Sequence, residues 1–140
     1  MSELNLMKTH KRLYAAAGAL ELATGSLPKK DKLLVKLRGS FENGCRFCID
    51  MHSREALKQD FGQTWIDAIQ AWPETRGQFD ERENLVLEFT TAGTRLSDRD
   101  FDVTLQERVI AELGEKTTGD LIGAITAINM WNRIGVLSQK

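Results

Sequence analysis

The chain has 140 residues, 41% of them hydrophobic, so it can bury one core but is short for two domains. Its 19 basic and 20 acidic side chains give a formal net charge of -1, which offers no general attraction for nucleic acid or an anionic membrane. We therefore expect a single domain over residues 1–140 that binds neither nucleic acid nor a membrane.

The apolar segments and the cysteines of the sequence indicate the cellular location and exclude a disulfide-rich secreted protein. The first twelve residues lack the apolar centre of a signal peptide, and the longest uncharged run, residues 121–132, is too short to span a bilayer. The sequence thus predicts a cytoplasmic protein. Its only two cysteines lie three positions apart, which excludes a framework of disulfides between distant segments.

The apolar pattern predicts an all-α fold of about six to seven helices. Apolar residues recur every three or four positions, and no segment of any length alternates as a strand would. The expected helices are 7–24 ended by Gly25, 29–40, one from the cap Asn43 through Cys45 to Gln59, 64–71, 81–94, a segment capped at Ser97-Asp98 and closed by Gly114 (or a shorter helix 105–113 within it), and 118–137.

Two of these helices have faces that could serve either for packing or for binding. In the helix 29–40 the leucines and Val35 should face inward, and we interpret the basic residues as a solvated face rather than a binding patch. These basic residues are Lys29, Lys30, Lys32, Lys36 and Arg38. The helix 118–137 is apolar around much of its circumference, which predicts burial in the core or against another subunit.

Small and aromatic residues of the last helix are also interpreted as packing residues. Gly119, Gly123 and Ala127 recur at four-residue spacing, which favours close approach of a neighbouring backbone over a ligand role. Trp131 is expected to pack in the core or an interface, although it could also line a substrate pocket. Asn132 could shape either a site or an interface, as could Asn129 and Arg133.

The segment ENGCRFCIDMH, residues 42–52, carries the candidate chemistry. Cys45, Cys48 and His52 are separated by three and four positions, which places them on one face if the segment is helical. The cysteine spacing suits a reversible disulfide, and a helix N-terminus stabilises a thiolate. The helix dipole favours Cys45 as the attacking sulfur, whereas a proton acceptor at His52 favours Cys48. Because a specific acceptor outweighs a diffuse dipole, we choose Cys48.

Other interpretations of this segment are weaker. Zinc would use both thiolates and His52 but needs a fourth ligand, and the only other histidine is His10. Attachment of c-type haem requires histidine directly after the second cysteine, where Ile49 stands. The cysteines could also simply fill core space. We expect no metal and no cofactor.

At these residues the chain resembles the AhpD-like alkylhydroperoxidases of the carboxymuconolactone decarboxylase superfamily. Their signature is an Asn-Gly-Cys-x-x-Cys-x-x-x-His segment after a basic and apolar helix, and here the matching stretch is residues 34–52. Residues 71–72, 79–83 and 127–133 look like further stretches of the same family. The resemblance implies an AhpD-like helical bundle with the redox motif at a helix N-terminus, assembled as a homo-oligomer (dimer, trimer or hexamer).

The resemblance also implies roles for the motif residues. Cys48 would be the peroxidatic cysteine, Cys45 the resolving cysteine, and His52 part of a proton relay. Many family members carry a glutamate twelve positions before the first cysteine, where this sequence has Leu33. Glu42, three positions before Cys45, is our candidate for a substitute proton acceptor, and the alternative is a solvated carboxylate favoured by the local helix dipole.

We therefore expect an enzyme, a thiol-dependent alkylhydroperoxidase. It would reduce a hydroperoxide through a Cys48 sulfenate that Cys45 resolves, and a dithiol protein or small-molecule reductant would regenerate the pair. One alternative is a non-catalytic, oligomeric redox sensor, which the leucine at position 33 keeps open. A second is lactone decarboxylase chemistry with His52 as acid or base, although that chemistry has no use for two adjacent thiols.

Overall fold

The computed structural model describes residues 3–140, and this part of the chain contains seven α-helices, one short 3-10 helix and no strand. The all-α prediction and the expected number of helices are confirmed. The elements are α1 (Leu6–Thr9), α2 (Lys11–Ala23), α3 (Lys29–Asn43), α4 (Arg46–Lys58), α5 (Gln63–Gln70), η1 (Arg76–Gln78), α6 (Glu81–Thr94) and α7 (Val103–Leu137).

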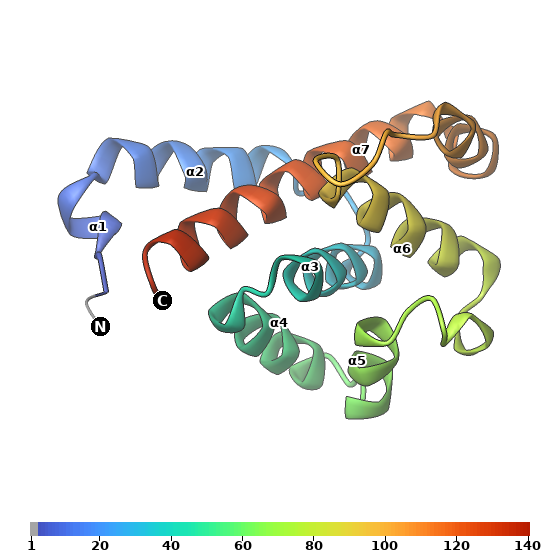
Figure 1. Ribbon diagram of the computed structural model, residues 1–140, viewed down its shortest axis with the longest axis horizontal. Coiled ribbons are helices and arrows are strands. Elements are labelled where there is room, and N and C mark those ends of the chain that lie inside the picture. The colour runs from blue at the N-terminus through green and yellow to red at the C-terminus, as the bar shows by residue number, and fades with distance from the viewer. Residues whose placement is uncertain (1–2) are drawn as a thin grey trace.

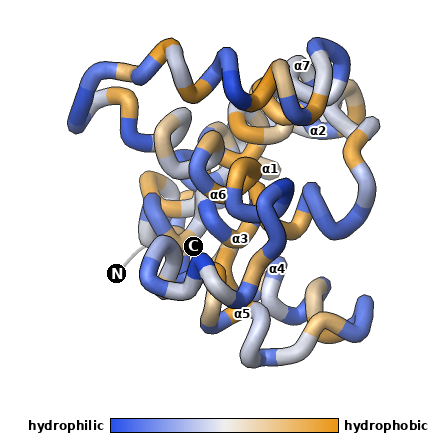
Figure 2. Tube along the Cα trace, turned by 90° about the vertical axis from the view of Figure 1, so that its right-hand side faces the viewer, coloured by the Kyte–Doolittle hydropathy of each residue, from blue (hydrophilic) through white to orange (hydrophobic). Residues whose placement is uncertain are grey.

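Helix α3 forms the centre of the bundle. It contacts α4, α5, α6 and α7, and Figure 1 shows it between α7 on one side and α4 and α5 on the other. Its apolar residues Leu33, Leu34, Val35 and Leu37 are all at most 1% exposed, as their spacing predicts. Along the helices of Figure 2 the chain changes repeatedly between hydrophobic and hydrophilic residues, as expected for helices with one buried face.

The N-terminal helices lie outside this core. The predicted single helix 7–24 is interrupted at His10, where the backbone is not helical, and α2 ends at Ala23 with Thr24 as its C-cap, so Gly25 does not provide a left-handed stop. Within residues 3–140, α2 packs mainly on α1 and α7, and Ala17 is its only buried residue. This thin packing leaves one face of α2 uncovered.

The junction of α3 and α4 differs from the sequence prediction. Helix α3 continues three residues beyond Ser40, and Asn43 is its last residue rather than the cap of the next helix. Gly44 adopts the left-handed conformation with φ of 64°, which ends the helix without a Cβ penalty. Cys45 is therefore the N-cap of α4.

The later helices follow the predicted bounds more closely. Helix α6 has the predicted range, and it begins with a capping box between Asp80 and Glu83. Gly114 breaks α7 as expected, with φ of 86°, but the cap of this segment is Asp102 and not Ser97-Asp98. No helix among residues 3–140 combines the length and the apolar character needed to cross a bilayer.

The predicted solvated face of α3 is wrong for Arg38, whereas Lys29 and Lys30 are exposed as predicted. Arg38 is only 6% exposed, and its guanidinium donates to the carbonyl oxygens of Ile69 at 2.8 Å and Trp72 at 3.1 Å. Lys30 pairs with Glu83 at 2.9 Å. The sequence shows that these side chains are charged. It does not show which of them find a hydrogen-bond or ion-pair partner in the fold.

Candidate functional site

The two cysteines form a disulfide at the start of α4. Cys45 is 1% exposed and Cys48 is 3% exposed, and their Cα atoms are 5.2 Å apart. As the N-cap, Cys45 precedes the first turn, and its Sγ accepts a hydrogen bond from the Cys48 backbone N–H at 3.3 Å. Only Cys48 and His52 thus share a face within the helix. The N-terminal charge of α4 stabilises a thiolate at Cys45 when the disulfide opens.

Helix α7 packs directly on the disulfide. A Cβ atom at Gly135 would lie 2.7 Å from Cys45 Sγ and 3.3 Å from Cys48 Sγ, so only glycine fits here without displacement. The Trp131 carbonyl oxygen lies 3.9 Å from Cys48 Sγ. The predicted strip of small residues is confirmed only in part, because Gly123 approaches Thr24 whereas Gly119 faces open space.

One of the two sulfurs opens into a cavity of about 590 Å³ between α2, α3, α4 and α7. Cys48 and His52 line this cavity, whereas Cys45 does not. Trp131 contributes to the wall, with Tyr14 packed edge-on against it at a ring-centroid distance of 5.6 Å. Of the two interpretations of Trp131, the structure matches the pocket wall. A molecule in the cavity therefore meets Cys48 and not Cys45.

His52 is held by a carboxylate within its own helix. Its Nδ1 lies 3.0 Å from Oε2 of Glu55, three residues further along α4. Because a carboxylate only accepts, Nδ1 carries the proton and Nε2 keeps a free lone pair. Burial is the main cause that lowers the pKa of His52, and nearby Lys36 lowers it further, against the raising effect of Glu55. The imidazole is therefore neutral near pH 7 and can accept a proton.

A line of charged groups continues from His52 along the cavity. Lys36 Nζ lies 4.0 Å from Glu55 and 3.5 Å from Glu21, and the other oxygen of Glu21 accepts from Trp131 Nε1 at 3.3 Å. All of these residues line the cavity. These contacts link α4, α3, α2 and α7 in sequence. Glu55, the partner of His52, is thereby held against Lys36.

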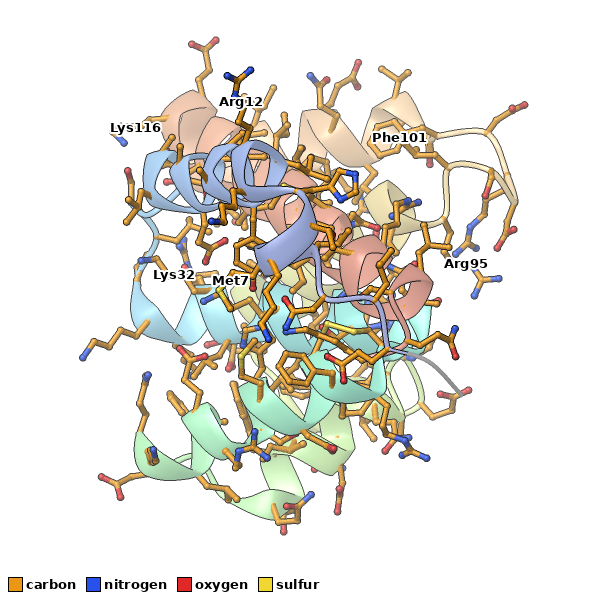
Figure 3. All side chains as sticks on the ribbon, turned by 90° about the vertical axis from the view of Figure 1, so that its left-hand side faces the viewer. Met7, Arg12, Lys32, Arg95, Phe101 and Lys116 are labelled. Atoms are coloured by element: carbon orange, nitrogen blue, oxygen red, sulfur yellow. A yellow bond between two sulfur atoms is a disulfide. The ribbon has the colours of Figure 1, made fainter. Side chains whose placement is uncertain are left out.

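Glu42 lies in a different environment. Its carboxylate contacts the buried Arg38 and, at 2.8 Å, Arg95 at the end of α6, and it does not line the cavity. Figure 3 shows Arg95 on the opposite side of the molecule from Lys32, which lines the cavity. Glu42 is thus neither a solvated cap carboxylate nor close to the imidazole. Among the residues described, Glu42 therefore makes no contact through which it could exchange a proton with a group in the cavity.

The asparagines around the motif join α3 to α7. Asn132 is fully buried, and its side-chain amide lies 3.0 Å from Ser40 Oγ and 2.9 Å from the Asn43 amide. Asn129 also contacts Asn43 at 2.9 Å. These contacts fix the loop that leads into Cys45. Leu33, at the position of the family glutamate, lies in the core at 1% exposure.

Several residues that line the cavity or contact the disulfide have little or no signal in the sequence. Glu55 had a local signal, since it lies three positions after His52 on a predicted helix. Lys36 and Glu21 had none, because their approach to Glu55 depends on how three helices pack. Gly135 continues the four-residue spacing of the predicted glycine strip, but only the fold shows that it faces the sulfurs.

Comparison with known proteins agrees with this geometry. An uncharacterised protein, YdfG, of Bacillus subtilis strain 168 is 33% identical over 111 residues, which cover 79% of this chain and 75% of the relative. The crystal structure of ATU0492 from Agrobacterium tumefaciens matches with a TM-score of 0.94 at 30% identity, over 100% of this chain and 97% of that one. ATU0492 is a protein of unknown function described as a candidate AhpD antioxidant defence protein.

The family assignment rests on a further match and on the fold. The model of the carboxymuconolactone decarboxylase family matches residues 9–92, a span that runs from the end of α1 through the cysteine pair and well into α6. The bundle is AhpD-like throughout its described length. From the sequence match and the shared fold together, the chain belongs to the carboxymuconolactone decarboxylase family.

Proposed function

We propose that the protein is a thiol-dependent alkylhydroperoxidase that works through the Cys45–Cys48 pair. The observation that carries this proposal is the asymmetry of the two sulfurs. Cys48 lines the cavity together with His52, whereas Cys45 sits behind it at the helix N-cap. A peroxidatic cysteine needs access to substrate and a base, and a resolving cysteine needs only to reach its partner.

The oxidative half of the cycle balances with these groups. His52 Nε2 takes the thiol proton of Cys48, and the thiolate attacks the terminal oxygen of the hydroperoxide. The O–O bond breaks, Cys48 becomes a sulfenic acid, and the alkoxide leaves as an alcohol with the proton that His52 returns. The Cys45 thiol then displaces hydroxide from the Cys48 sulfur, which releases water and forms the disulfide.

The reductive half follows from the same asymmetry. A thiolate of a dithiol reductant attacks Cys48, because that sulfur lines the cavity. Cys45 leaves as a thiolate, which the N-terminus of α4 and the Cys48 N–H stabilise. The second thiol of the reductant then displaces Cys48 and becomes oxidised, so two electrons pass from the dithiol to the peroxide in each cycle.

The test is consumption of cumene hydroperoxide in the presence of dithiothreitol. We expect catalytic consumption by the wild-type protein and none above background by Cys48→Ser. Equal rates for the two proteins would rule the mechanism out. Stoichiometric oxidation of the wild type to the disulfide without turnover would favour the redox sensor.

We also propose that the protein works as a homo-oligomer. Large apolar side chains of α2 and α7 are exposed in the single chain, among them Leu22 at 85% and Ile122 at 49%. Exposed apolar side chains on helices that pack together, as α2 and α7 do, are typical of contact between subunits. Sedimentation equilibrium tests this proposal, with a mass at a multiple of 15.8 kDa as the expected result and a monomer as the contradicting one.

A further inference from the structure

The lining of the cavity extends from Cys48 to Lys32. Along α7, Gly135 faces the disulfide, whereas Gly123 faces Thr24 beside the turn between α2 and α3. These glycines are twelve positions apart on the helix, which corresponds to roughly 18 Å of helix axis. Lys32 Nζ lies at the Thr24 end, 3.8 Å from the position of a Cβ atom at Gly25.

Lys32 has no counterion within the part of the chain that the structure describes. It forms neither an ion pair nor a side-chain hydrogen bond among residues 3–140, although it is half-buried and lines the cavity. Its neighbour Lys36, one turn along α3, is placed between Glu21 and Glu55. The ammonium of Lys140 covers the Phe47 ring near the sulfur end. Lys32 is therefore the distal cation of the cavity.

On its α7 side the wall between the two ends is apolar, whereas the charged Glu21, Lys36 and Glu55 line the cavity from α2, α3 and α4. Ala124 and Ala127 of α7 leave space where longer side chains would fill it, and Ile128 and Trp131 continue the same wall toward Cys48. Leu22 of α2 borders the cavity from the opposite helix. Such a wall suits a hydrocarbon chain, since apolar surface is the main source of affinity in a cavity of this kind.

We propose that the cavity binds an amphiphilic hydroperoxide with a carboxylate at its far end. The carboxylate pairs with Lys32, the hydrocarbon lies along the alanines of α7, and the peroxide group reaches Cys48. A single ammonium matches one monovalent anion, whereas a phosphate group is typically held by several donors. This inference rests on the proposed peroxidase function and names its substrate class.

The kinetic test compares linoleic acid 13-hydroperoxide with its methyl ester. In the wild type we expect kcat/KM for the acid to exceed that for the ester about tenfold, mainly through KM, because the ester lacks the charge that Lys32 binds. Lys32→Met should remove this preference, so that kcat/KM for the acid falls to about the value for the ester. Lys29→Met, on the exposed start of the same helix, should keep it.

A binding measurement separates this inference from the peroxidase proposal. Linoleate without a peroxide group should quench the fluorescence of Trp131 in the oxidised protein, and Lys32→Met should weaken its binding about tenfold. Trp131→Phe identifies the signal. Lys32-dependent binding without peroxide turnover would support the site while ending the peroxidase proposal. Turnover of cumene hydroperoxide with equal use of acid and ester, or an acid preference that survives in Lys32→Met, would overturn the inference.

Discussion

Two carboxylates with different partners, Glu42 and Glu55, show how packing separates a charge that stabilises the fold from one that can act in chemistry. The Glu42 side chain is 8% exposed and contacts two guanidinium groups, of which Arg38 is itself buried. The Glu55 side chain is 38% exposed and contacts an imidazole at 3.0 Å and a lysine at 4.0 Å. A carboxylate held by two cations stabilises the fold, whereas one beside a titratable imidazole in a cavity can influence proton transfer.

The largest expected effect is the loss of stability when Glu42, which contacts Arg38 and Arg95, is neutralised. Glu42→Gln should lower the free energy of unfolding by about 3–5 kcal/mol, because it leaves the buried guanidinium of Arg38 without its counterion. Urea unfolding measures this loss. Glu88→Gln is the matched control, since Glu88 also contacts two arginines but both are more than half exposed, and it should cost less than about 1 kcal/mol. Equal losses in the two variants would contradict the structural role of Glu42.

On the cavity side, His52→Gln should act on rate rather than stability. Loss of the general base should reduce kcat/KM for cumene hydroperoxide at pH 7 by roughly 100-fold. Stopped-flow oxidation of the reduced protein measures the step directly. His10→Gln removes the exposed histidine between α1 and α2 and should leave the rate unchanged. If both variants react like the wild type, no base acts at position 52.

The contact between Gly135 of α7 and the two sulfurs should leave no room for a larger side chain. Gly135→Ala places a Cβ against both sulfurs and should lower the unfolding free energy of the oxidised protein by roughly 1–3 kcal/mol. Gly119→Ala, on the same helix with no atom within 4 Å, should instead stabilise by about 0.5–1 kcal/mol. The same small gain at both positions would show that α7 does not press on the disulfide.

The smallest effect expected is a change in pH dependence. The hydrogen bond from Glu55 raises the pKa of His52, so Glu55→Gln should move the acidic limb of kcat/KM to lower pH and reduce the plateau about tenfold through lost orientation. Lys36 lowers the pKa of His52, so Lys36→Met should move the limb to higher pH. A pH series of kcat/KM measures both. Shifts in the same direction would disprove the proposed electrostatics.

The fold was predictable where local signals agreed with tertiary packing. The bounds of α6 follow from Asp80 and Glu83, which form a capping box within the segment itself. The cap of α4 was missed, since Asn43 has the right chemistry but turns its amide toward Asn129 and Asn132 of α7. A cap prediction from sequence cannot include a partner more than 80 residues away.

In the candidate site, too, residues close together in the sequence were predictable, whereas residues brought together by packing were not. Cys45, Cys48 and His52 are predictable from the sequence because they fall within eight consecutive residues. Glu42 is near Cys45 in the sequence, but its position on α3 brings it to Arg38. Lys36 appeared as surface charge, and only the packing of α2, α3 and α4 brings it to Glu55. Sequence distance therefore predicted the sulfur chemistry and not the electrostatics around it.

Trapping of the sulfenic acid tests the central claim most directly. Reduced Cys45→Ser, treated with one equivalent of cumene hydroperoxide and then dimedone, should carry one adduct on Cys48, identified by peptide mass spectrometry, because no resolving thiol remains. Reduced Cys48→Ser under the same conditions should stay unmodified. An adduct on Cys45 that forms at a similar rate, or no adduct on Cys48, would contradict the assignment of Cys48 as the attacking sulfur.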